Sequence, residues 1–305
     1  MTRNRGRAYF ALQAAAGFLW WIAVFTLPAV RYATLGSLDP VLIAIFDIPL
    51  FVIGSALAAY GLKVAAVVSA GWTVLVAVVL AVYASVTTEA GPGALVMAAA
   101  AGGSLVALSL MHLGRVPTRW MLRGPFAFRP AAQRVTARPH IAATMVQLLI
   151  FWGFFLVAVP HFLMLLEQRW AVALHFPGLA GPAGVSLLVL ASTLGISSAL
   201  VMSRVGQGTP LPSAMPNRLV IAGPYRWIRN PMAVAGIVQG AAMGLILGSW
   251  LVIAYAVLGS LLWNYAVRPL EESDLEMRFG EEFRQYRRNV CCWIPRLSVL
   301  ERVHR

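Results

Sequence analysis

The residues best suited to binding chemistry lie in the decapeptide GPYRWIRNPM, residues 223–232, which separates a polar loop from a strongly apolar run. It holds a Gly-Pro turn, two arginines, two large aromatic residues and an Asn-Pro step. The surrounding loop, residues 204–231, is rich in prolines, which fix φ, and in glycines, which permit unusual angles: Pro210, Pro212, Pro216, Pro224, Pro231, Gly206, Gly208 and Gly223. A stiff backbone can hold N–H and C=O groups toward a ligand, so we predict a binding loop here.

A second polar segment begins with the pentapeptide Arg268-Pro269-Leu270-Glu271-Glu272. Proline suits the first turn of a helix, and the helix dipole favours carboxylates in that turn. Apolar residues then recur at helical spacing: Leu275, Phe279, Phe283, Tyr286 and Val290. We predict a helix that packs against protein or membrane. An amphipathic helix lying in the membrane interface would show the same pattern.

Two apolar runs, residues 232–248 and 250–266, separate these polar segments and predict a helix hairpin that turns at Ser249. Asn230 is suited to be the N-cap of the first helix, with Pro231 in its first turn. A hairpin returns the chain to the side where it started, so the loop and the tail are predicted to be neighbours in space. No Ser-His-Asp arrangement, phosphate-binding loop or dinucleotide fingerprint accompanies them, and the adjacent Cys291 and Cys292 lack metal-ligand spacing, so we predict no metal site.

The composition is that of a protein that crosses the membrane several times. Hydrophobic residues make up 60% of the 305 and charged residues 11%, whereas soluble domains carry about a quarter charged residues. The net charge of +13 could indicate nucleic-acid binding. In a chain with a mean hydropathy of +0.76 it better fits a topology signal and contacts with anionic lipid headgroups, so we expect membrane lipids and no nucleic acid as partners.

We predict an all-α integral membrane protein with about eight transmembrane helices, because apolar runs of nearly twenty residues recur along the chain. The predicted spans are 8–30, 41–60, 62–86, 93–113, 141–166, 183–203, 232–248 and 250–266. The first is too long for the apolar region of a signal peptide and is expected to be an uncleaved span. With the N-terminus inside, only Arg31 and Arg169 among the Lys and Arg residues fall outside. The positive-inside rule then predicts that both termini are cytoplasmic. We expect the membrane to be a bacterial-type plasma membrane.

The loop 115–140 carries six arginines and no acidic residue, and it divides the chain into two predicted domains. Residues 1–140 form a four-span block, and residues 141–305 form a second membrane domain with a core motif at 205–296. In the first block, Asp47 lies within a span, where a carboxylate is costly, and marks either a functional site or a hydrogen bond between packed helices. In the second, the glycines 236, 240, 244 and 248 form a ridge along one helix face. We favour tight packing of this ridge over an open ligand groove.

The stretches NRLVIAGPYRWIRNPM and EESDLEMRFGEEFRQYRRNV, with WIPR after them, resemble the isoprenylcysteine carboxyl methyltransferase family, which forms a wider group with the phospholipid N-methyltransferases. The resemblance covers residues 205–296 and implies an integral membrane methyltransferase that uses S-adenosylmethionine. It implies that the hairpin and the helical tail form the cofactor site. The cofactor-binding residues it implies are Asn217, Arg218, Leu219, Val220, Tyr225, Asn230, Pro231, Met232, Ala233 and Glu271.

The chain departs from the family pattern at three positions. The substrate-binding arginine of the family lies four residues before the glutamate, where this chain has Val267, so the neighbouring Arg268 becomes the candidate for orienting the substrate. Asn217 and Ala233 stand where the family usually has His and Tyr. These two departures bear on the prenylcysteine substrate of the family more than on the cofactor.

The acceptor implied by this resemblance is a lipophilic molecule whose reacting group lies at the cytoplasmic headgroup level. Arg226, Arg229 and Arg268 lie at that level and favour a carboxyl group over a phospholipid amine. The alternative is that some of these arginines only bind lipid phosphate or fix the topology. Two other functions fit parts of the pattern. One is an NADPH-dependent membrane reductase of the sterol type, which has a similar C-terminal arrangement, and the other is a membrane scaffold without catalysis.

Overall fold

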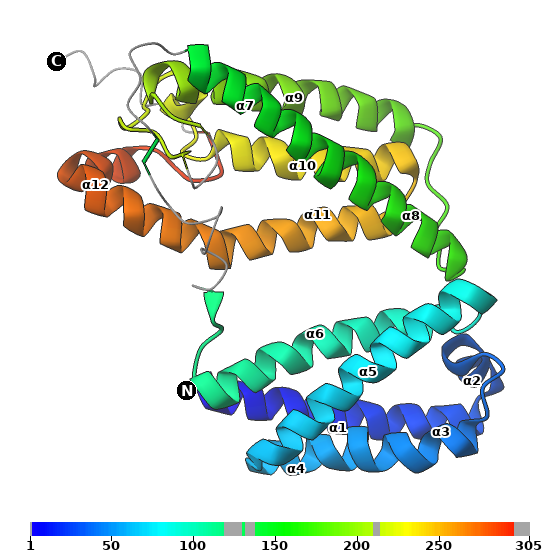
Figure 1. Ribbon diagram of the computed structural model, residues 1–305. Helices are drawn as coiled ribbons and strands as arrows, with labels where there is room; N and C mark the ends of the chain where they lie inside the picture. The colour runs from blue at the N-terminus through cyan, green and yellow to red at the C-terminus, as the bar shows by residue number, and fades with distance from the viewer. Residues whose placement is uncertain (1, 119–129, 132–137, 210–213, 296–305) are drawn as a thin grey trace. The chain divides into compact units, whose positions relative to one another are not determined.

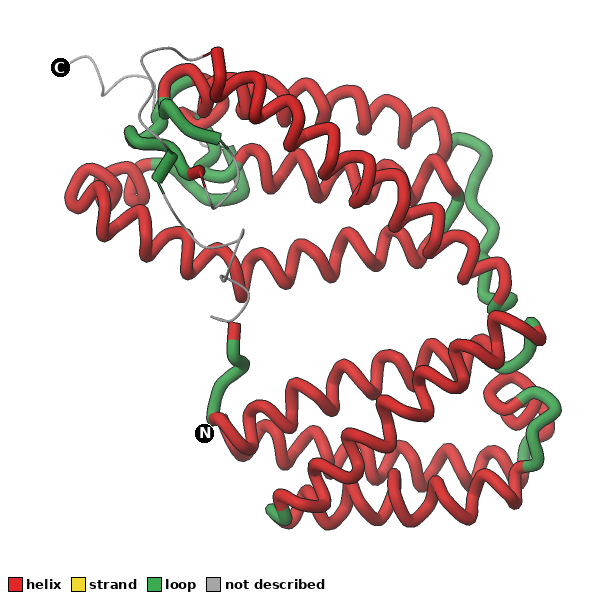
Figure 2. The backbone as a smooth tube through the Cα atoms, in the orientation of Figure 1, coloured by secondary structure: helices red, strands yellow, loops and turns green. Residues whose placement is uncertain are grey.

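The computed structural model describes residues 2–118, 130–131, 138–209 and 214–295. These residues are nearly all helical and contain no β-strand, apart from one isolated bridge between Pro130 and Met215 (Figure 2). The predicted all-α class is therefore confirmed. The chain divides into two compact units. The front unit comprises Met1–Pro117 and Leu165–Ala173, and the rear unit comprises Thr118–Met164 and Leu174–Arg305.

The front unit is a bundle in which the long helices α1, α5 and α6 pack together with the segment from α3 to α4 (Figure 1). Where sequence analysis placed one span at 8–30, the structure has two helices, because Pro28 lacks an N–H and begins a new helix after Leu27. The elements are α1 (Thr2–Thr26), α2 (Pro28–Leu35), α3 (Pro40–Asp47), η1 (Ile48–Ile53), α4 (Gly54–Tyr60), α5 (Lys63–Thr87) and α6 (Gly91–Leu113).

Asp47 is a hydrogen-bond acceptor between packed helices of the front unit. Its Oδ2 accepts from the indole N–H of Trp21 on α1 at 2.9 Å, and its Oδ1 accepts from Trp72 on α5 at 2.8 Å. The side chain is only 5% exposed. A second buried contact joins Gln13 of α1 to Ser55 of α4 at 3.0 Å. Of the two interpretations drawn from the sequence, these contacts support helix packing, because both carboxylate oxygens already have donors.

The rear unit contains two long packed pairs, α9 with α10 and α10 with α11 (Figure 1). Its last helix continues directly from α11 into the polar tail. The elements are α7 (Arg138–Phe151), η4 (Trp152–Ala158), α8 (Val159–Arg169, whose end belongs to the front unit), α9 (Ala180–Val205), η6 (Gly223–Arg226), α10 (Pro231–Leu247), α11 (Trp250–Leu262), η7 (Trp263–Val267) and α12 (Arg268–Asn289).

Two π-helical turns of this unit each precede a proline. Segment η4 ends just before Pro160 and η7 ends just before Pro269. Proline removes one helical N–H and crowds the carbonyl of the preceding turn, and a widened turn relieves that crowding. The helix from α11 to α12 therefore stays continuous up to Gly280, which bends it with a φ of +53°.

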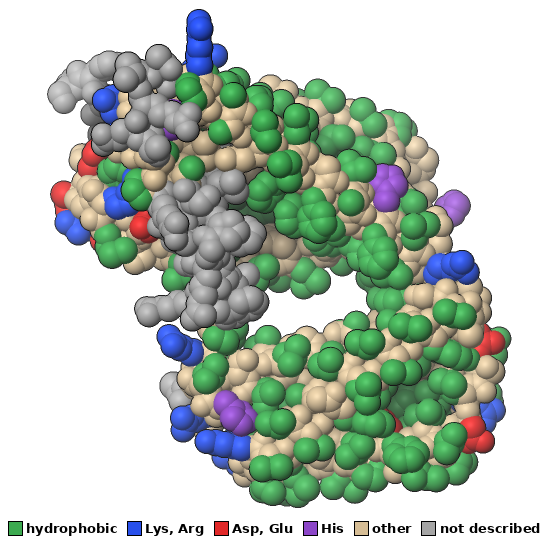
Figure 3. Space-filling model, viewed as in Figure 1, with side chains coloured by type: hydrophobic (Ala, Val, Ile, Leu, Met, Phe, Trp, Pro, Cys, Tyr) green, Lys and Arg blue, Asp and Glu red, His purple; other side chains and the backbone are tan. Residues whose placement is uncertain are grey.

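The helices are long and apolar enough for a multi-pass integral membrane protein. Seven helices in the described part of the chain meet this criterion: Thr2–Thr26, Pro40–Tyr60, Lys63–Thr87, Gly91–Leu113, Arg138–Arg169, Ala180–Val205 and Trp250–Asn289. The remaining predicted span, 232–248, corresponds to α10, which is shorter at 17 residues. Large hydrophobic side chains lie along the outer sides of the helices (Figure 3). Leu149 and Leu190, for example, are 70% and 68% exposed. Such continuous apolar exposure suits contact with lipid.

Candidate active site

The polar loop and the helical tail of the rear unit are joined by hydrogen bonds, as the hairpin prediction requires. The Arg229 N–H donates to the Cys291 carbonyl at 3.0 Å, and the Tyr286 hydroxyl donates to the Tyr225 carbonyl at 2.6 Å. Arg278 of α12 also donates to the carbonyl of Pro216. The prediction that these segments are neighbours in space is confirmed. The tail therefore holds the decapeptide 223–232 in place.

Within the loop, polar side chains satisfy backbone groups. The Asn217 amide donates to the carbonyl of Gln207 in the same loop at 2.9 Å and to that of Ala131, outside the loop, at 3.1 Å. Gly223 has a φ of +58°, where an L side chain would be strained. Pro231 opens α10 as predicted, with Asn230 at the N-cap position. The Asn230 side chain makes no capping hydrogen bond, however, and turns instead toward the sulfur of Cys292, at 3.4 Å.

A cavity of about 640 Å³ lies between this loop, α12 and the membrane helices of the rear unit. Its polar end contains Tyr225, Arg229, Glu271 and Glu272. Its apolar walls come from α7, η4, α9, α10 and α11, with aromatic residues such as Trp152. The cavity therefore joins a charged end to a largely hydrocarbon interior, which is the arrangement that an amphiphilic ligand requires.

Most of the residues that the family resemblance implies for the cofactor line this cavity. Asn217 and Pro231 do not, and neither does the proposed substrate residue Arg268, whereas its neighbour Val267 does. Asn217 is instead occupied with the loop backbone. The residues from the implied set that line the cavity are Arg218, Leu219, Val220, Tyr225, Asn230, Met232, Ala233 and Glu271.

The charges at the polar end are only partly balanced. Glu272 lies 3.2 Å from Nη1 of Arg229 and 3.9 Å from Nε of Arg268. Within the described part of the chain, the Glu271 carboxylate has no such ion pair. Glu271 lies in α12, beyond the apolar part of the helix that ends at Val267. Burial, together with the negative charges of Glu272 and Asp274, raises the pKa of Glu271 to about 7.

Tyr225 is the second unpartnered polar group at this end. The residue is 5% exposed, and its buried hydroxyl has no hydrogen-bond partner among the described residues. Burial raises the pKa of Tyr225 well above its usual value, with smaller contributions from Tyr286 and Glu271. A buried hydroxyl without a hydrogen-bond partner is costly. The Tyr225 hydroxyl and the Glu271 carboxylate are therefore available to a ligand that offers donors or positive charge.

The comparison with known families falls on this site. Residues 180–282 match the family model of the phospholipid methyltransferases. The matched residues run from α9 into α12 and include both the loop and the start of the tail. This family belongs to the wider group that the sequence motifs indicated, so that recognition is confirmed. No match was found among curated proteins.

The glycine ridge of α10, inside the matched residues 180–282, has two roles. A Cβ on Gly244 would lie 2.9 Å from the backbone nitrogen of Ile253, and one on Gly240 would lie 3.0 Å from the Cβ of Ala256. These two glycines therefore let α10 pack closely on α11. A Cβ on Gly236 would meet nothing within 4 Å, and Gly236 lines the cavity. The tight packing that the sequence favoured is therefore found at Gly240 and Gly244, in the middle of the ridge, but not at Gly236.

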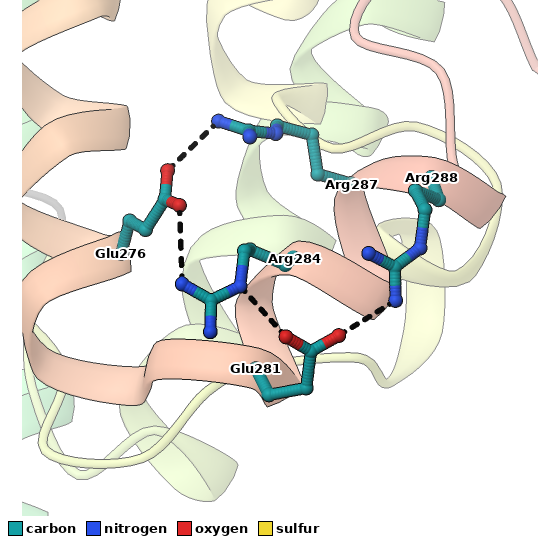
Figure 4. A network of polar contacts seen from close by, with 5 residues as sticks. All are labelled: Glu276, Glu281, Arg284, Arg287 and Arg288. Carbon is teal, nitrogen blue, oxygen red and sulfur yellow. Dashed lines mark hydrogen bonds and ion pairs between the residues drawn. The ribbon is translucent and has the colours of Figure 1, made fainter.

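On the outer side of α12, ion pairs connect the two parts of the helix that meet at Gly280 (Figure 4). Glu281 lies 2.7 Å from both Arg284 and Arg288. Glu276, before the bend, lies 3.0 Å from Arg287, after it. Exposed pairs of this kind contribute little to stability, because water and salt screen them. They help to keep the bend, and none of these side chains lines the cavity.

One wall of the cavity comes from outside the matched residues 180–282 and was not predicted from the sequence. It is formed by α7 and η4, and the Tyr255 hydroxyl of α11 donates to the Phe155 carbonyl of this wall at 3.4 Å. A sequence signal for this wall was a glutamine, Gln147, within the apolar run 141–166. The residues of this wall are Gln147, Leu148, Phe151, Trp152, Phe155 and Leu156.

Proposed function

We propose that this protein is a membrane-embedded, S-adenosylmethionine-dependent methyltransferase that acts on a lipophilic acceptor. The observation that carries the proposal is the cavity of the rear unit, in which unpartnered polar groups at a rigid loop meet an apolar interior. A soluble acceptor would gain little from such walls, whereas a lipid can leave its tail among them. The family match to residues 180–282 supports methyl transfer as the reaction.

The residues of the polar end suit S-adenosylmethionine, a cation with an ammonium group, a carboxylate and an adenine ring. Glu271 would hold a positively charged group, because its carboxylate has no ion pair within the described residues. The hydroxyl of Tyr225 and the backbone of Arg218, Leu219 and Val220 would hold its polar groups. When bound, this cofactor supplies a methyl group on a positively charged sulfur.

The work of the protein in such a reaction is to align the donor and the acceptor and to keep water out. The hydrogen bond from Tyr286 to the Tyr225 carbonyl and the bond from Arg229 to Cys291 fix the loop. The apolar walls around Trp152 exclude water from the interior. A carboxylate acceptor needs no base, whereas an amine acceptor must first lose a proton.

The reacting head group of the acceptor is either a carboxylate or a phospholipid amine. The sequence favoured a carboxylate because Arg226, Arg229 and Arg268 lie at this level. Two of these arginines, Arg229 and Arg268, lie beside Glu272, which balances part of their charge. The arginines therefore favour a carboxylate less than their number suggests, and a phospholipid amine stays in the proposal.

The first experiment measures cofactor binding to the purified full-length protein. We expect the wild type to bind S-adenosylmethionine and not NADPH, and Glu271→Gln to weaken that binding by at least tenfold while the protein keeps its thermal unfolding temperature. A matched control is Glu281→Gln, on the outer side of α12, which should bind as the wild type does. Binding of NADPH would instead support the reductase, and binding of neither would support the scaffold.

The second experiment identifies the chemistry of the product. Membranes that contain the protein are given S-adenosylmethionine labelled in its methyl group, and the lipid extract is treated with mild base. Label that base releases indicates a carboxyl methyl ester, and label that resists base indicates a methylated amine. Label found only in water-soluble products would contradict the lipophilic acceptor.

A further inference from the structure

The front unit has a cavity of its own, of about 450 Å³, to which the proposed reaction gives no role. This front cavity lies inside the bundle of α1, α3, η1, α5 and α6, outside the matched residues 180–282. Its lining is almost entirely apolar. Large side chains of the lining include Leu12, Trp20, Phe46, Phe51, Trp72 and Leu75.

A layer of buried polar side chains closes one end of the front cavity. Gln13 of α1 donates to Ser55 of α4 at 3.0 Å and accepts from Ser104 of α6 at 2.8 Å. Ser55 in turn shares a hydrogen bond of 2.8 Å with Ser69 of α5. Such bonds join helices within a membrane. From this layer the front cavity extends toward the end of the bundle where α2 lies, and Leu35 of α2 lines it there (Figure 1).

The polar side chains that line the front cavity already have hydrogen-bond partners within the front unit. The Tyr9 hydroxyl donates to a carbonyl of α6 at 2.9 Å, and the Trp20 indole donates to the Thr34 hydroxyl at 3.2 Å. Gln13 belongs to the polar layer, and Asp47 accepts from two indoles. A bound water needs two to four polar partners, so the front cavity suits a group without polar atoms.

The front cavity is long and narrow. Its lining runs from Tyr9 to Trp20 on α1, over about 16 Å, and from Trp72 to Leu80 on α5, over about 12 Å. This is about half of the ~30 Å hydrocarbon thickness of a bilayer, which is the share of one leaflet. A volume of 450 Å³ over this length gives a width of about 6 Å. An extended hydrocarbon chain fits that width, whereas a helix, about 10 Å across, does not.

The side of the front cavity is open between α3 and α5. Helix α5 packs on α4, η1 and α6, whereas α3 packs on η1 and α1. Phe46 of α3 and Leu75 and Val79 of α5 line the front cavity, and each of these side chains is more than half exposed. In contrast, Leu35 and Leu80 line it and are buried. In a membrane, the hydrocarbon within reach of this opening is that of the surrounding lipids.

We propose that the front cavity is a binding site for one hydrocarbon chain of a membrane lipid, which enters between α3 and α5 while the lipid head group stays outside. The chain makes the dispersion contacts that an unfilled cavity would forfeit. Because the lining offers no free polar group, the site selects for the chain and not for the head. This inference does not depend on the proposed methyl transfer, whose cavity lies in the rear unit.

Photocrosslinking tests this site in phosphatidylcholine vesicles that contain the purified full-length protein. The probes carry a diazirine: a phosphatidylcholine and a phosphatidylglycerol labelled within one chain, the free fatty acid with that chain, and a sterol labelled in its rings. Mass spectrometry locates the labelled residues. Ala100→Phe and Ala16→Phe each place a ring in the front cavity. Their matched controls are Ala99→Phe and Ala15→Phe, whose neighbouring positions are exposed and do not line it.

We expect both phospholipids to label buried lining residues such as Phe51 and Leu80, and to do so equally. Ala100→Phe and Ala16→Phe should each lower this label about tenfold, because the added ring takes the space of the chain. The control variants should keep it. Label on Val78, which is exposed and does not line the front cavity, should be the same in all variants.

Label confined to exposed residues, an equal loss in the control variants, or a marked preference for one phospholipid head would each overturn the proposal. Labelling of the lining by the sterol or the free fatty acid in place of the phospholipids would overturn the assigned occupant. The thermal unfolding temperature of each variant is measured in parallel. The two ring-bearing variants are on different helices, so either one that folds decides the result.

Discussion

At the scale of single residues, the site depends on which charges already have partners. Glu272 lies beside Arg229 and Arg268, whereas its neighbour Glu271 lines the cavity without an ion pair in the described chain. Two adjacent carboxylates on one helix thus have different tasks. Glu272 fixes arginines of the loop and the tail, and Glu271 is left for a cation.

This difference predicts a pH dependence of cofactor binding. The pKa of Glu271 is raised to about 7, so the carboxyl group of the free protein is largely protonated at pH 6 and ionised at pH 8. A cation binds the ionised form, so its binding releases a proton below pH 7. We expect the affinity for S-adenosylmethionine to fall as pH decreases below 7, by at most about tenfold per pH unit, and to level off above it.

Isothermal titration between pH 6 and 8 would measure this dependence. Glu271→Gln is the control. This variant should bind S-adenosylmethionine more weakly, and the part of the pH dependence that comes from Glu271 should be absent. Any pH dependence that comes from titration of the ligand itself should remain. An affinity of the wild type that is the same at both ends of the range would remove Glu271 from the cation site.

At the scale of elements, α10 and α11 approach each other closely at some glycines of α10, whereas at others there is free space beside the helix. A Cβ on Gly244 would meet Ile253 and a carbonyl of the turn, so Gly244→Ala should destabilise the protein by about 1–3 kcal/mol. A Cβ on Gly236 would meet no other atom within 4 Å, and alanine favours the helix more than glycine does. Gly236→Ala should therefore leave the free energy of unfolding unchanged or raise it by up to about 1 kcal/mol.

Thermal unfolding of both variants in one detergent measures this contrast. The two substitutions add the same methyl group to the same helix, two turns apart, so differences in helix propensity cancel. Equal unfolding temperatures would show that α10 does not pack on α11 as described.

At the scale of the whole molecule, we predict that both termini and the loop 115–140 lie in the cytoplasm. Most of that loop lies outside the described residues, but within the front unit the contacts agree with the assigned sides. Arg7 donates to the carbonyl of Ala59 at 2.8 Å, near the turn predicted to be inside. Ser37 donates to Glu89 at 2.9 Å, and both belong to turns predicted to be outside.

Thiol labelling of intact cells with a membrane-impermeant reagent tests this topology. After replacement of Cys291 and Cys292 by serine, His175→Cys should be labelled and Arg115→Cys should not, because they lie in turns on opposite sides of the predicted membrane. Both positions are exposed. Labelling of Arg115→Cys in sealed cells would reverse the predicted orientation.

The sequence by itself determined most of the helical spans, the start of α10 at Pro231 and the pairing of the loop with the tail. These features follow from local causes: apolar runs of membrane length, prolines that begin helices, and a hairpin that returns the chain to its starting side. Each of the two polar motifs is a single uninterrupted stretch of sequence, so each could be found without knowing how the helices pack.

Only the tertiary structure decided which side chains meet across helices. It gave Asp47 its two indole donors, turned Asn217 toward the loop backbone, and brought Gln147 to the wall of the cavity. The physical reason is the rotation of each helix about its own axis. In a span that is apolar on all sides, the hydrophobic pattern does not determine that rotation, and contacts between helices select it.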